Sequence, residues 1–306
     1  MTSAIRTRGL TKDYGSGRGL FGLDLEVAEG EIFGYLGPNG AGKSTTIKTL
    51  MDLVRPSAGQ AEIFGLDCQK KAVEVKRLVG YVPGELPQFG SMRGRDVVAY
   101  LGAMGGGVDQ AKVKTASERL QLDLGQRYRE YSTGNKQKLA LVLSLMHSPR
   151  LLILDEPSSG LDPLNQQVFY QLIREARDAG ATVFLSSHIL SEVEHSCDRV
   201  AIIRAGMLVN VASLEEIHRI RTKRVEVEFA GEVPLARLQS AQGVEDLRVA
   251  GNRVHCVVRG DFEPLMEAIA HAHVVNLTSH EPSLEEIFLA YYSKDGSAAV
   301  PEEATA

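Results

Sequence analysis

The pattern of hydrophobic and polar positions divides the chain into two parts. Up to about residue 220, short apolar runs at 30–37, 150–157 and 181–188 alternate with stretches of helical periodicity. Continuous apolar strands interleaved with helices are typical of a parallel sheet that is covered on both faces. We therefore expect an α/β fold for this part of the chain.

Within this part, the strand pattern fades between residues 86 and 147, and helical periodicity takes its place. We interpret this stretch as a helical subdomain that is inserted into the α/β fold. With the subdomain included, the first domain is expected to cover residues 1–222.

The pattern changes after Lys223. Residues 224–229 alternate apolar and charged side chains, which indicates a half-buried strand. A helical pattern, two strand patterns joined at Gly251-Asn252, a second helical pattern and a last strand pattern follow. This β-α-β-β-α-β order predicts a small α+β domain of the ferredoxin-like type over residues 223–293. The last residues, 294–306, are small, polar and acidic, and we expect them to be disordered.

The composition limits the classes of partner and compartment. The 306 residues are 43% hydrophobic and 24% charged, which is ordinary for a globular protein with one large and one small domain. There are 34 basic and 39 acidic residues, a net charge of −5, and no basic stripe, so we expect no nucleic-acid partner. The longest apolar run, at 139–146, is far shorter than the ~20 residues of a membrane span. Together with an N-terminus that lacks a signal-peptide pattern, this predicts a cytoplasmic protein.

Residues 37–45 read GPNGAGKST and match the phosphate-binding pattern G-x-x-x-x-G-K-[ST], after an apolar strand and before a helix. Glycines let successive backbone N–H groups turn toward an anion, and the helix N-terminus adds partial positive charge. Lys43 can then reach the β- and γ-phosphates, and the Ser44 hydroxyl can ligate Mg²⁺. We therefore predict a site for ATP and Mg²⁺. Its phosphate-binding residues are expected to be Gly37, Asn39, Gly40, Gly42, Lys43, Ser44 and Thr45.

A pair of carboxylates ends the apolar run LLILDE at residues 151–156. An acid at such a strand end can hold the metal, and we assign this role to Asp155. The acid beside it can polarise the attacking water, and we assign this role to Glu156. A strand that ends in acids can also be a solvated sheet edge, and it is the phosphate-binding loop that favours the catalytic interpretation.

Further motifs follow in a fixed order: YSTGN at 131–135, SGLD at 159–162, and Ser187-His188. With the phosphate-binding loop and LILDEP, they make residues 3–215 resemble the nucleotide-binding subunit of an ABC transporter. The resemblance implies the P-loop NTPase fold of ABC ATPases, hydrolysis of ATP, and head-to-tail pairing with a second copy of the chain.

In that family, the signature of one chain closes on the ATP that the other chain holds. The resemblance therefore implies that Ser132 and Gly134 contact phosphate across the pair. The family pattern L-S-G-G-Q reads Y-S-T-G-N here, so Thr133 adds a side chain where the pattern has none. An ordinary helix start that is capped by Ser132 is the alternative.

Three more residues match family positions, and two of them keep an alternative. His188 matches the histidine that contacts the γ-phosphate. Asp162 matches the loop that communicates between paired chains, and before Pro163 it also fits a helix cap. Tyr14 matches the aromatic residue that stacks on adenine, but it could equally be a packing residue.

One position departs from the family in a way that affects the metal site. Family members carry a glutamine after the strand at 79–83, where it senses Mg²⁺ and the membrane partner, and this chain has Gly84-Glu85. Glu85 could supply an oxygen to the metal, or it could be a surface acid. The detail of how ATP occupancy reaches the partner is therefore open.

The lack of a membrane segment implies that an integral-membrane permease comes from another chain. The second domain and its ending EPSLEEIFL, at 281–289, resemble the C-terminal extension of bacterial ABC-2 type exporter ATPases. That group moves drugs, antibiotics, lipids or polysaccharides, and its ATPases lie on the inner face of the cell membrane.

Two other functions compete with the exporter. The first is a soluble ABC ATPase that acts on ribosomes or DNA, but this chain has one P-loop, no heptad run, no cysteine pair and an acidic balance. The second is a binding module in which ATP is only structural, and the presence of Glu156 argues against it.

Overall fold

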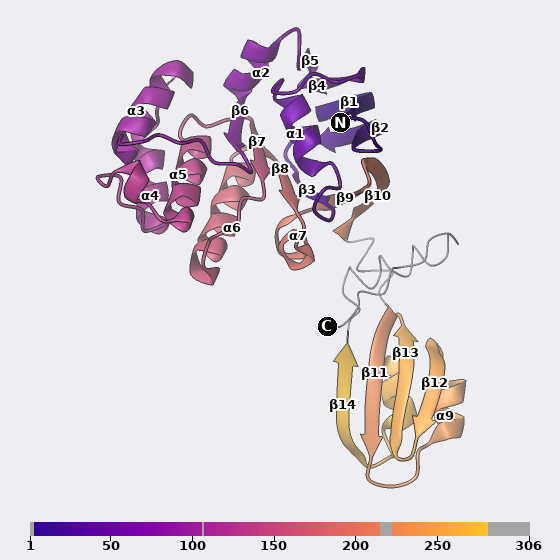
Figure 1. The fold of residues 1–306 in the computed structure, drawn as a ribbon. Coiled ribbons are helices and arrows are strands. Elements are labelled where there is room, and N and C mark those ends of the chain that lie inside the picture. The colour runs from indigo at the N-terminus through magenta and orange to yellow at the C-terminus, as the bar shows by residue number, and fades with distance from the viewer. Residues whose placement is uncertain (1–2, 106, 215–221, 281–306) are drawn as a thin grey trace. The chain divides into compact units, whose positions relative to one another are not determined.

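The computed structural model describes residues 3–105, 107–214 and 222–280 (Figure 1). The chain divides into two compact units, residues 1–214 and 215–306, and each has its own hydrophobic core. The expected exporter motif at 281–289 and the expected disordered tail at 294–306 lie outside the described residues.

The first unit is built on two sheets. Its strands are β1 (Ser3–Asp13), β2 (Gly19–Ala28), β3 (Ile32–Leu36), β4 (Ala58–Ile63), β5 (Leu66–Asp67), β6 (Val79–Val82), β7 (Leu151–Asp155), β8 (Thr182–Ser187), β9 (Arg199–Arg204) and β10 (Met207–Ser213). The smaller sheet has the order β2-β1-β4-β5, with antiparallel neighbours throughout. The larger sheet has the order β10-β9-β3-β8-β7-β6 and is parallel except for β10. The expected α/β fold is confirmed.

Helices pack around these sheets and fill the stretch between β6 and β7. They are α1 (Lys43–Leu50), α2 (Ala72–Leu78), α3 (Gly94–Gly105), α4 (Gln110–Arg119), the 3₁₀ helix η1 (Tyr128–Glu130), α5 (Thr133–Leu145), α6 (Pro163–Asp178) and α7 (Leu190–Ser196). Helices α3 to α5 occupy the stretch where helical periodicity replaces the strand pattern, and Figure 1 shows them grouped beside α6.

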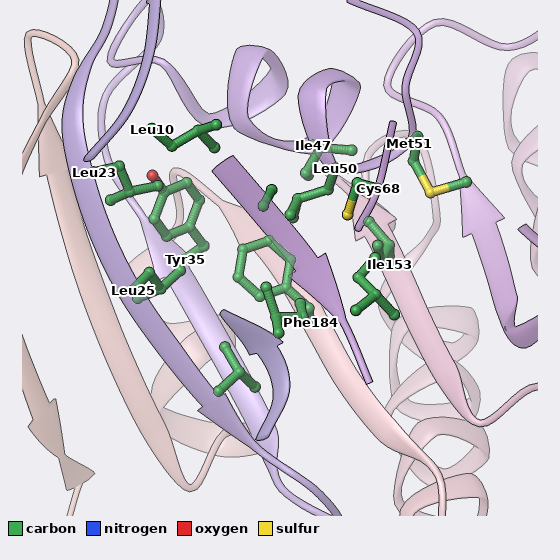
Figure 2. Close-up of a cluster of buried hydrophobic side chains, with 14 of the residues drawn as sticks. Leu10, Leu23, Leu25, Tyr35, Ile47, Leu50, Met51, Cys68, Ile153 and Phe184 are labelled. Atoms are coloured by element: carbon green, nitrogen blue, oxygen red, sulfur yellow. The ribbon is translucent and has the colours of Figure 1, made fainter. Parts of the chain in front are cut away.

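A buried cluster between the two sheets anchors the start of α1 (Figure 2). The rings of Tyr35 on β3 and Phe184 on β8 have centroids 5.2 Å apart, and Ile47 of α1 packs in the same cluster. The Tyr35 hydroxyl lies 3.1 Å from Thr46 Oγ1, one turn into α1. Burial raises the pKa of Tyr35, so this hydroxyl stays neutral near pH 7. The core thus fixes α1, and with it the loop that precedes the helix.

Strand register brings the ends of three buried strands to one edge of the larger sheet. Leu36, the last residue of β3, pairs with Ser187, the last residue of β8. Asp155, the last residue of β7, pairs with Ser186. The loops that follow these strands therefore begin side by side, as loops do at the carboxyl edge of a parallel sheet.

The second unit has the element order β11 (Thr222–Phe229), α9 (Leu235–Ser240), β12 (Val244–Ala250), β13 (Arg253–Arg259), α10 (Glu263–Ile269) and β14 (Val274–His280). Its antiparallel sheet has the order β12-β13-β11-β14, which is the ferredoxin-like arrangement. Alternate residues of β11 and β13 pack with Leu238 of α9 and Leu265 of α10 in its core. Across the part of the chain that the structure describes, no helix is long and apolar enough to cross a membrane.

Candidate active site

The phosphate-binding loop connects β3 to α1, and its glycines have backbone geometry that other residues rarely adopt. Gly40 has φ 80° and Gly42 has φ 109°, both in the left-handed region. At Gly37, a Cβ atom would lie 2.4 Å from the carbonyl oxygen of Ile203. The loop therefore has room only for glycine at Gly37, and it keeps its backbone available to a ligand.

Lys43 is the first residue of α1, and only 6% of it is exposed. Its Nζ donates to the carbonyl oxygen of Gly37 at 2.6 Å and lies 3.2 Å from Glu156 Oε1. Ser44 is exposed and Thr45 is half-buried beside it. The lysine ammonium is thus surrounded by oxygen atoms, the kind of partner that phosphate groups also provide.

Glu156 joins the phosphate-binding loop to the end of β8. One carboxylate oxygen contacts Lys43, and the other, Oε2, lies 2.7 Å from His188 Nδ1. Glu156 has φ 50° and its backbone N–H donates to Ser186 Oγ at 3.1 Å, which holds this unusual conformation. The structure therefore brings Lys43, Glu156 and His188 into one cluster, from motifs that are far apart in the sequence.

Asp155 lies next to this cluster and is only 1% exposed. Ser186 Oγ donates to Asp155 Oδ1 at 2.6 Å. The backbone of Gly84 passes close by, since a Cβ there would lie 2.9 Å from Asp155 Oδ2. Glu85 itself is exposed and lines a groove of about 410 Å³ beside the helical subdomain.

Tyr14 lies in the turn between β1 and β2, which borders the phosphate-binding loop. The side chain is 53% exposed, and Lys12 Nζ lies 5.2 Å from the ring centroid. The carbonyl oxygen of Gly19, at the end of this turn, would lie 3.1 Å from a Cβ on Gly42. The ring is therefore exposed near the phosphate-binding loop, and its stacking on adenine stays a prediction.

The signature residues contact a different part of the site. Ser132 is exposed and caps α5, because its Oγ accepts a hydrogen bond from the backbone N–H of Asn135 at 3.2 Å. Gly134 packs against the loop after Glu156: a Cβ on it would lie 2.7 Å from the carbonyl oxygen of Gly160. In the described part of the chain, these contacts link the signature to α5 and to the loop and not to Lys43.

Asp162 caps α6, as the helix-cap interpretation predicts. Its Oδ1 accepts a hydrogen bond from the backbone N–H of Asn165 at 3.0 Å, and its Oδ2 accepts one from the Asn165 side chain at 2.6 Å. These hydrogen bonds lower the pKa of Asp162 below its ordinary value. This role leaves the proposed communication between paired chains untested.

The phosphate-binding loop and the side chains beside it fit a nucleoside triphosphate with Mg²⁺. Within the described residues, no group of three or more His, Cys, Asp or Glu side chains could hold a metal ion. Mg²⁺ binds mainly through phosphate oxygens, water and one or two protein oxygens. The exposed hydroxyl of Ser44, which follows Lys43 in the chain, and the carboxylate of Asp155, which precedes Glu156, can supply such protein oxygens.

Two neighbours of the site could not be found from the sequence motifs. Ser186 binds both Asp155 and the backbone of Glu156, and Gln137 Nε2 of α5 donates to the carbonyl oxygen of Pro157 at 2.9 Å. Ser186 adjoins Ser187-His188, so its place in the sequence was a weak signal. Nothing in the sequence marks Gln137, because its contact depends on how α5 packs against the loop.

The comparisons with known proteins agree with this geometry. The family model described as ABC transporter matches residues 20–159. The bacitracin transport ATP-binding protein BcrA of Bacillus licheniformis is 33% identical, over 94% of this chain and 97% of its own length. The linearmycin resistance protein LnrL of Bacillus subtilis is 30% identical, over 93% and 97%. The daunorubicin/doxorubicin resistance protein DrrA of Streptomyces peucetius is 31% identical, over 99% and 96%.

Solved structures show the same fold for the first unit. An ATP-binding subunit of an ABC transporter superposes with a TM-score of 0.65 at 29% identity, over 71% of this chain and 92% of that one. A bacterial Atm1-family ABC exporter with ATP bound gives a TM-score of 0.61 at 26% identity, over 71% and 40%. The chain therefore belongs to the ATP-binding proteins of the ABC transporter family, and it binds and hydrolyses ATP.

Proposed function

We propose that this ATPase powers a separate integral-membrane permease, an ABC-2 type exporter of a drug, antibiotic, lipid or polysaccharide. The printed names of the relatives, which concern bacitracin transport and resistance to linearmycin and daunorubicin, support export of a toxic compound. The site supports the energy-supplying step. In this role the protein would act at the cytoplasmic face of the membrane, against the permease. The exporter motif at 281–289 supports the same assignment from the sequence alone.

The hydrolytic roles rest on one observation: the carboxylate of Glu156 lies between Lys43 and His188. Glu156 is the base that orients and polarises water, and His188 contacts the γ-phosphate. Lys43 neutralises charge on the β- and γ-phosphates. Ser44 and Asp155 would hold Mg²⁺. Glu85, on the loop after β6, would either add an oxygen to the same metal or remain a surface acid.

The complete site needs a second copy of the chain. Ser132 is exposed at the N-terminus of α5, where backbone N–H groups favour an anion. In a head-to-tail pair, Ser132 and Gly134 of one copy close on the phosphates that the other copy holds. Closure of two such sites, followed by hydrolysis, supplies the motion that drives the permease.

The groove beside Glu85 is the proposed docking place for the permease. Its lining comes from β6, from the loop after β6 and from the helical subdomain. It is mainly apolar: Tyr81, Pro83, Leu86, Phe89, Leu139 and Leu143. A groove of this kind, bordered by Glu85 and Lys136, suits a short amphipathic helix of a membrane partner. The groove therefore connects the metal site to the partner through one loop.

The assignment is tested by turnover and by transport. Purified protein is expected to hydrolyse ATP only with Mg²⁺, and Glu156→Gln is expected to lower kcat at least about a hundredfold, as loss of a general base does. A membrane permease should co-purify with the chain, and Lys43→Ala should stop export by that complex. Turnover of Glu156→Gln at the wild-type rate would contradict the base assignment. Transport by the Lys43→Ala complex would contradict the coupling.

A further inference from the structure

A buried carboxylate lies beside the active site but belongs to none of the motifs. Glu192 is on α7, one helical turn after His188, and is 7% exposed. Its Oε1 accepts a hydrogen bond from Ser158 Oγ at 2.5 Å, and its Oε2 accepts one from Ser187 Oγ at 2.6 Å. Each oxygen of the carboxylate is therefore bound to a different loop of the site.

On one side, Glu192 fixes the residues that flank His188. Ser187 is fully buried, and its Oγ also accepts a hydrogen bond from the backbone N–H of Ile189 at 2.9 Å. Ser187 Oγ lies 3.2 Å from the carbonyl oxygen of Ile189 as well, but a hydroxyl has one proton, and the shorter contact with a carboxylate takes it. The Ser187 hydroxyl thus donates its hydrogen bond to the Glu192 carboxylate and accepts one from the backbone of Ile189. Ser187 therefore holds the backbone on both sides of His188.

On the other side, Glu192 fixes the loop that begins at Glu156. Ser158 is 4% exposed, and its carbonyl oxygen accepts a hydrogen bond from the backbone N–H of Leu161 at 3.0 Å. The preceding residue, Pro157, is held by Gln137 of α5. Because Glu156 has a left-handed φ, its orientation depends on such fixed neighbours.

A purely structural role would not account for the chemistry of this side chain. Both donors are neutral hydroxyl groups, and among the described residues no ion pair involves Glu192. A buried carboxylate without an opposite charge is costly. An apolar side chain would fill the same place in the fold without that cost. What the carboxylate provides here, and an apolar side chain does not, is a pair of polar atoms that join the Ser158 loop to the Ser187 turn.

We propose that Glu192 is a positioning residue for ATP hydrolysis. By binding Ser158 and Ser187, it keeps Glu156 and His188 in the contact at 2.7 Å that the structure shows. The inference rests on the proposed roles of Glu156 and His188. It assigns a function in catalysis to a residue whose carboxylate is bound to Ser158 and Ser187.

Steady-state kinetics of three variants test this inference. Glu192→Ala should lower kcat at least about tenfold and leave the KM for ATP within about threefold, because Glu192 binds the loops of the base and histidine and not the phosphate-binding loop. Glu192→Gln keeps one acceptor and gives the other serine an amide donor, so it should recover most of the rate. Ser191→Ala, an exposed position on the same helix, is the matched control and should behave as wild type. An unchanged kcat in Glu192→Ala, or a loss that appears mainly in KM, would overturn the inference.

A double-variant cycle separates positioning from general destabilisation. If Glu192 acts by keeping Glu156 and His188 in contact, then adding Glu192→Ala to a protein that already carries His188→Ala should lower kcat by less than about a further twofold. Losses that multiply would refute the role. If Glu192→Ala does not fold, Ser158→Ala is measured in the same cycle, with the same two outcomes. Glu156→Gln in the same assay shows whether the base assignment holds, so a failure of the proposed function is distinguished from a failure of this inference.

Discussion

At the scale of single residues, the contact between Lys43 and Glu156 affects ATP binding as well as hydrolysis. The ammonium and carboxylate lie 3.2 Å apart, and Lys43 is almost fully buried. A γ-phosphate that engages Lys43 competes with this carboxylate and is repelled by its charge. We therefore expect Glu156, the proposed base, to weaken the binding of ATP.

We expect Glu156→Gln to bind ATP about tenfold more tightly than wild type, a change of about 1.4 kcal/mol. The glutamine keeps the shape of the side chain but removes the charge that competes for Lys43. The measurement is the Kd for ATP by calorimetry in dilute protein, so that pairing of chains does not contribute. The control is Glu26→Gln, which removes an exposed carboxylate paired with Arg6 and should leave the Kd unchanged. Equal affinity of Glu156→Gln and wild type would contradict this explanation.

The sequence predicted the residues of this cluster but not their contacts. Residues 37–45 form a local motif, so their geometry follows from neighbouring residues and a helix start. The contact of Glu156 with His188 depends on β7 and β8 being neighbours in register, which no local pattern specifies. Glu192 has only a weak signal, an acid one turn after His188, because its function depends on two serines from different loops.

At the scale of elements, sequence patterns in the first unit predicted buried strands better than partly exposed ones. The runs in β3, β7 and β8 are buried throughout, and each was visible as a continuous apolar stretch. The smaller sheet was not predicted, because β1 and β2 mix buried and exposed positions with bulges that break the alternation. The strand order of the larger sheet also required tertiary information, since β3 lies between β9 and β8, two strands that are far from it in the sequence.

The cap of α6 gives a prediction with a defined pH dependence. Hydrogen bonds from Asn165 hold the pKa of Asp162 below its ordinary value of about 3.9. A carboxylate with a lowered folded-state pKa stabilises the protein above its unfolded pKa, and this stabilisation is lost as the pH falls through the folded-state pKa. Asp162→Ala should therefore lower the urea midpoint at pH 7, and the difference from wild type should shrink below about pH 4.

Asp162→Asn is the matched control for this cap. An amide oxygen can still accept from the backbone N–H of Asn165 but does not titrate between pH 3 and 7. Its difference from wild type should be smaller than that of Asp162→Ala at pH 7. A difference between Asp162→Ala and wild type that stays constant down to pH 3 would show that the carboxylate contributes nothing as an anion.

At the scale of the whole molecule, the two separate cores predict two separate unfolding transitions. Leu265 of α10 is fully buried in the core of the second unit. Leu265→Ala should cost about 2–5 kcal/mol and lower the transition of that unit by at least about 10 °C. Differential scanning calorimetry should show the transition of the first unit unchanged, and ATP turnover below both transitions should be unchanged too. Met266→Ala, on the same helix but 49% exposed, is the control. A single transition that shifts as a whole would contradict two independent cores.

The proposed pairing of two chains predicts a recovery of activity that a site within one chain could not produce. Lys43→Ala damages the phosphate-binding loop, and Ser132→Arg places a bulky side chain at an exposed signature position. Each variant alone forms pairs in which both sites are damaged, so each should be nearly inactive. In a mixed pair, the intact loop of the Ser132→Arg chain meets the intact signature of the Lys43→Ala chain, and one complete site results.

An equal mixture of the two variants should therefore recover up to about a quarter of the wild-type rate, because about half of the pairs are mixed and each has one of two sites intact. The recovery should vanish on dilution, as pairs separate. The control is each variant alone at the total protein concentration of the mixture, and it should stay inactive. A mixture that remains as inactive as its components would mean that each chain completes its own site, and the signature at Ser132 would then need another role.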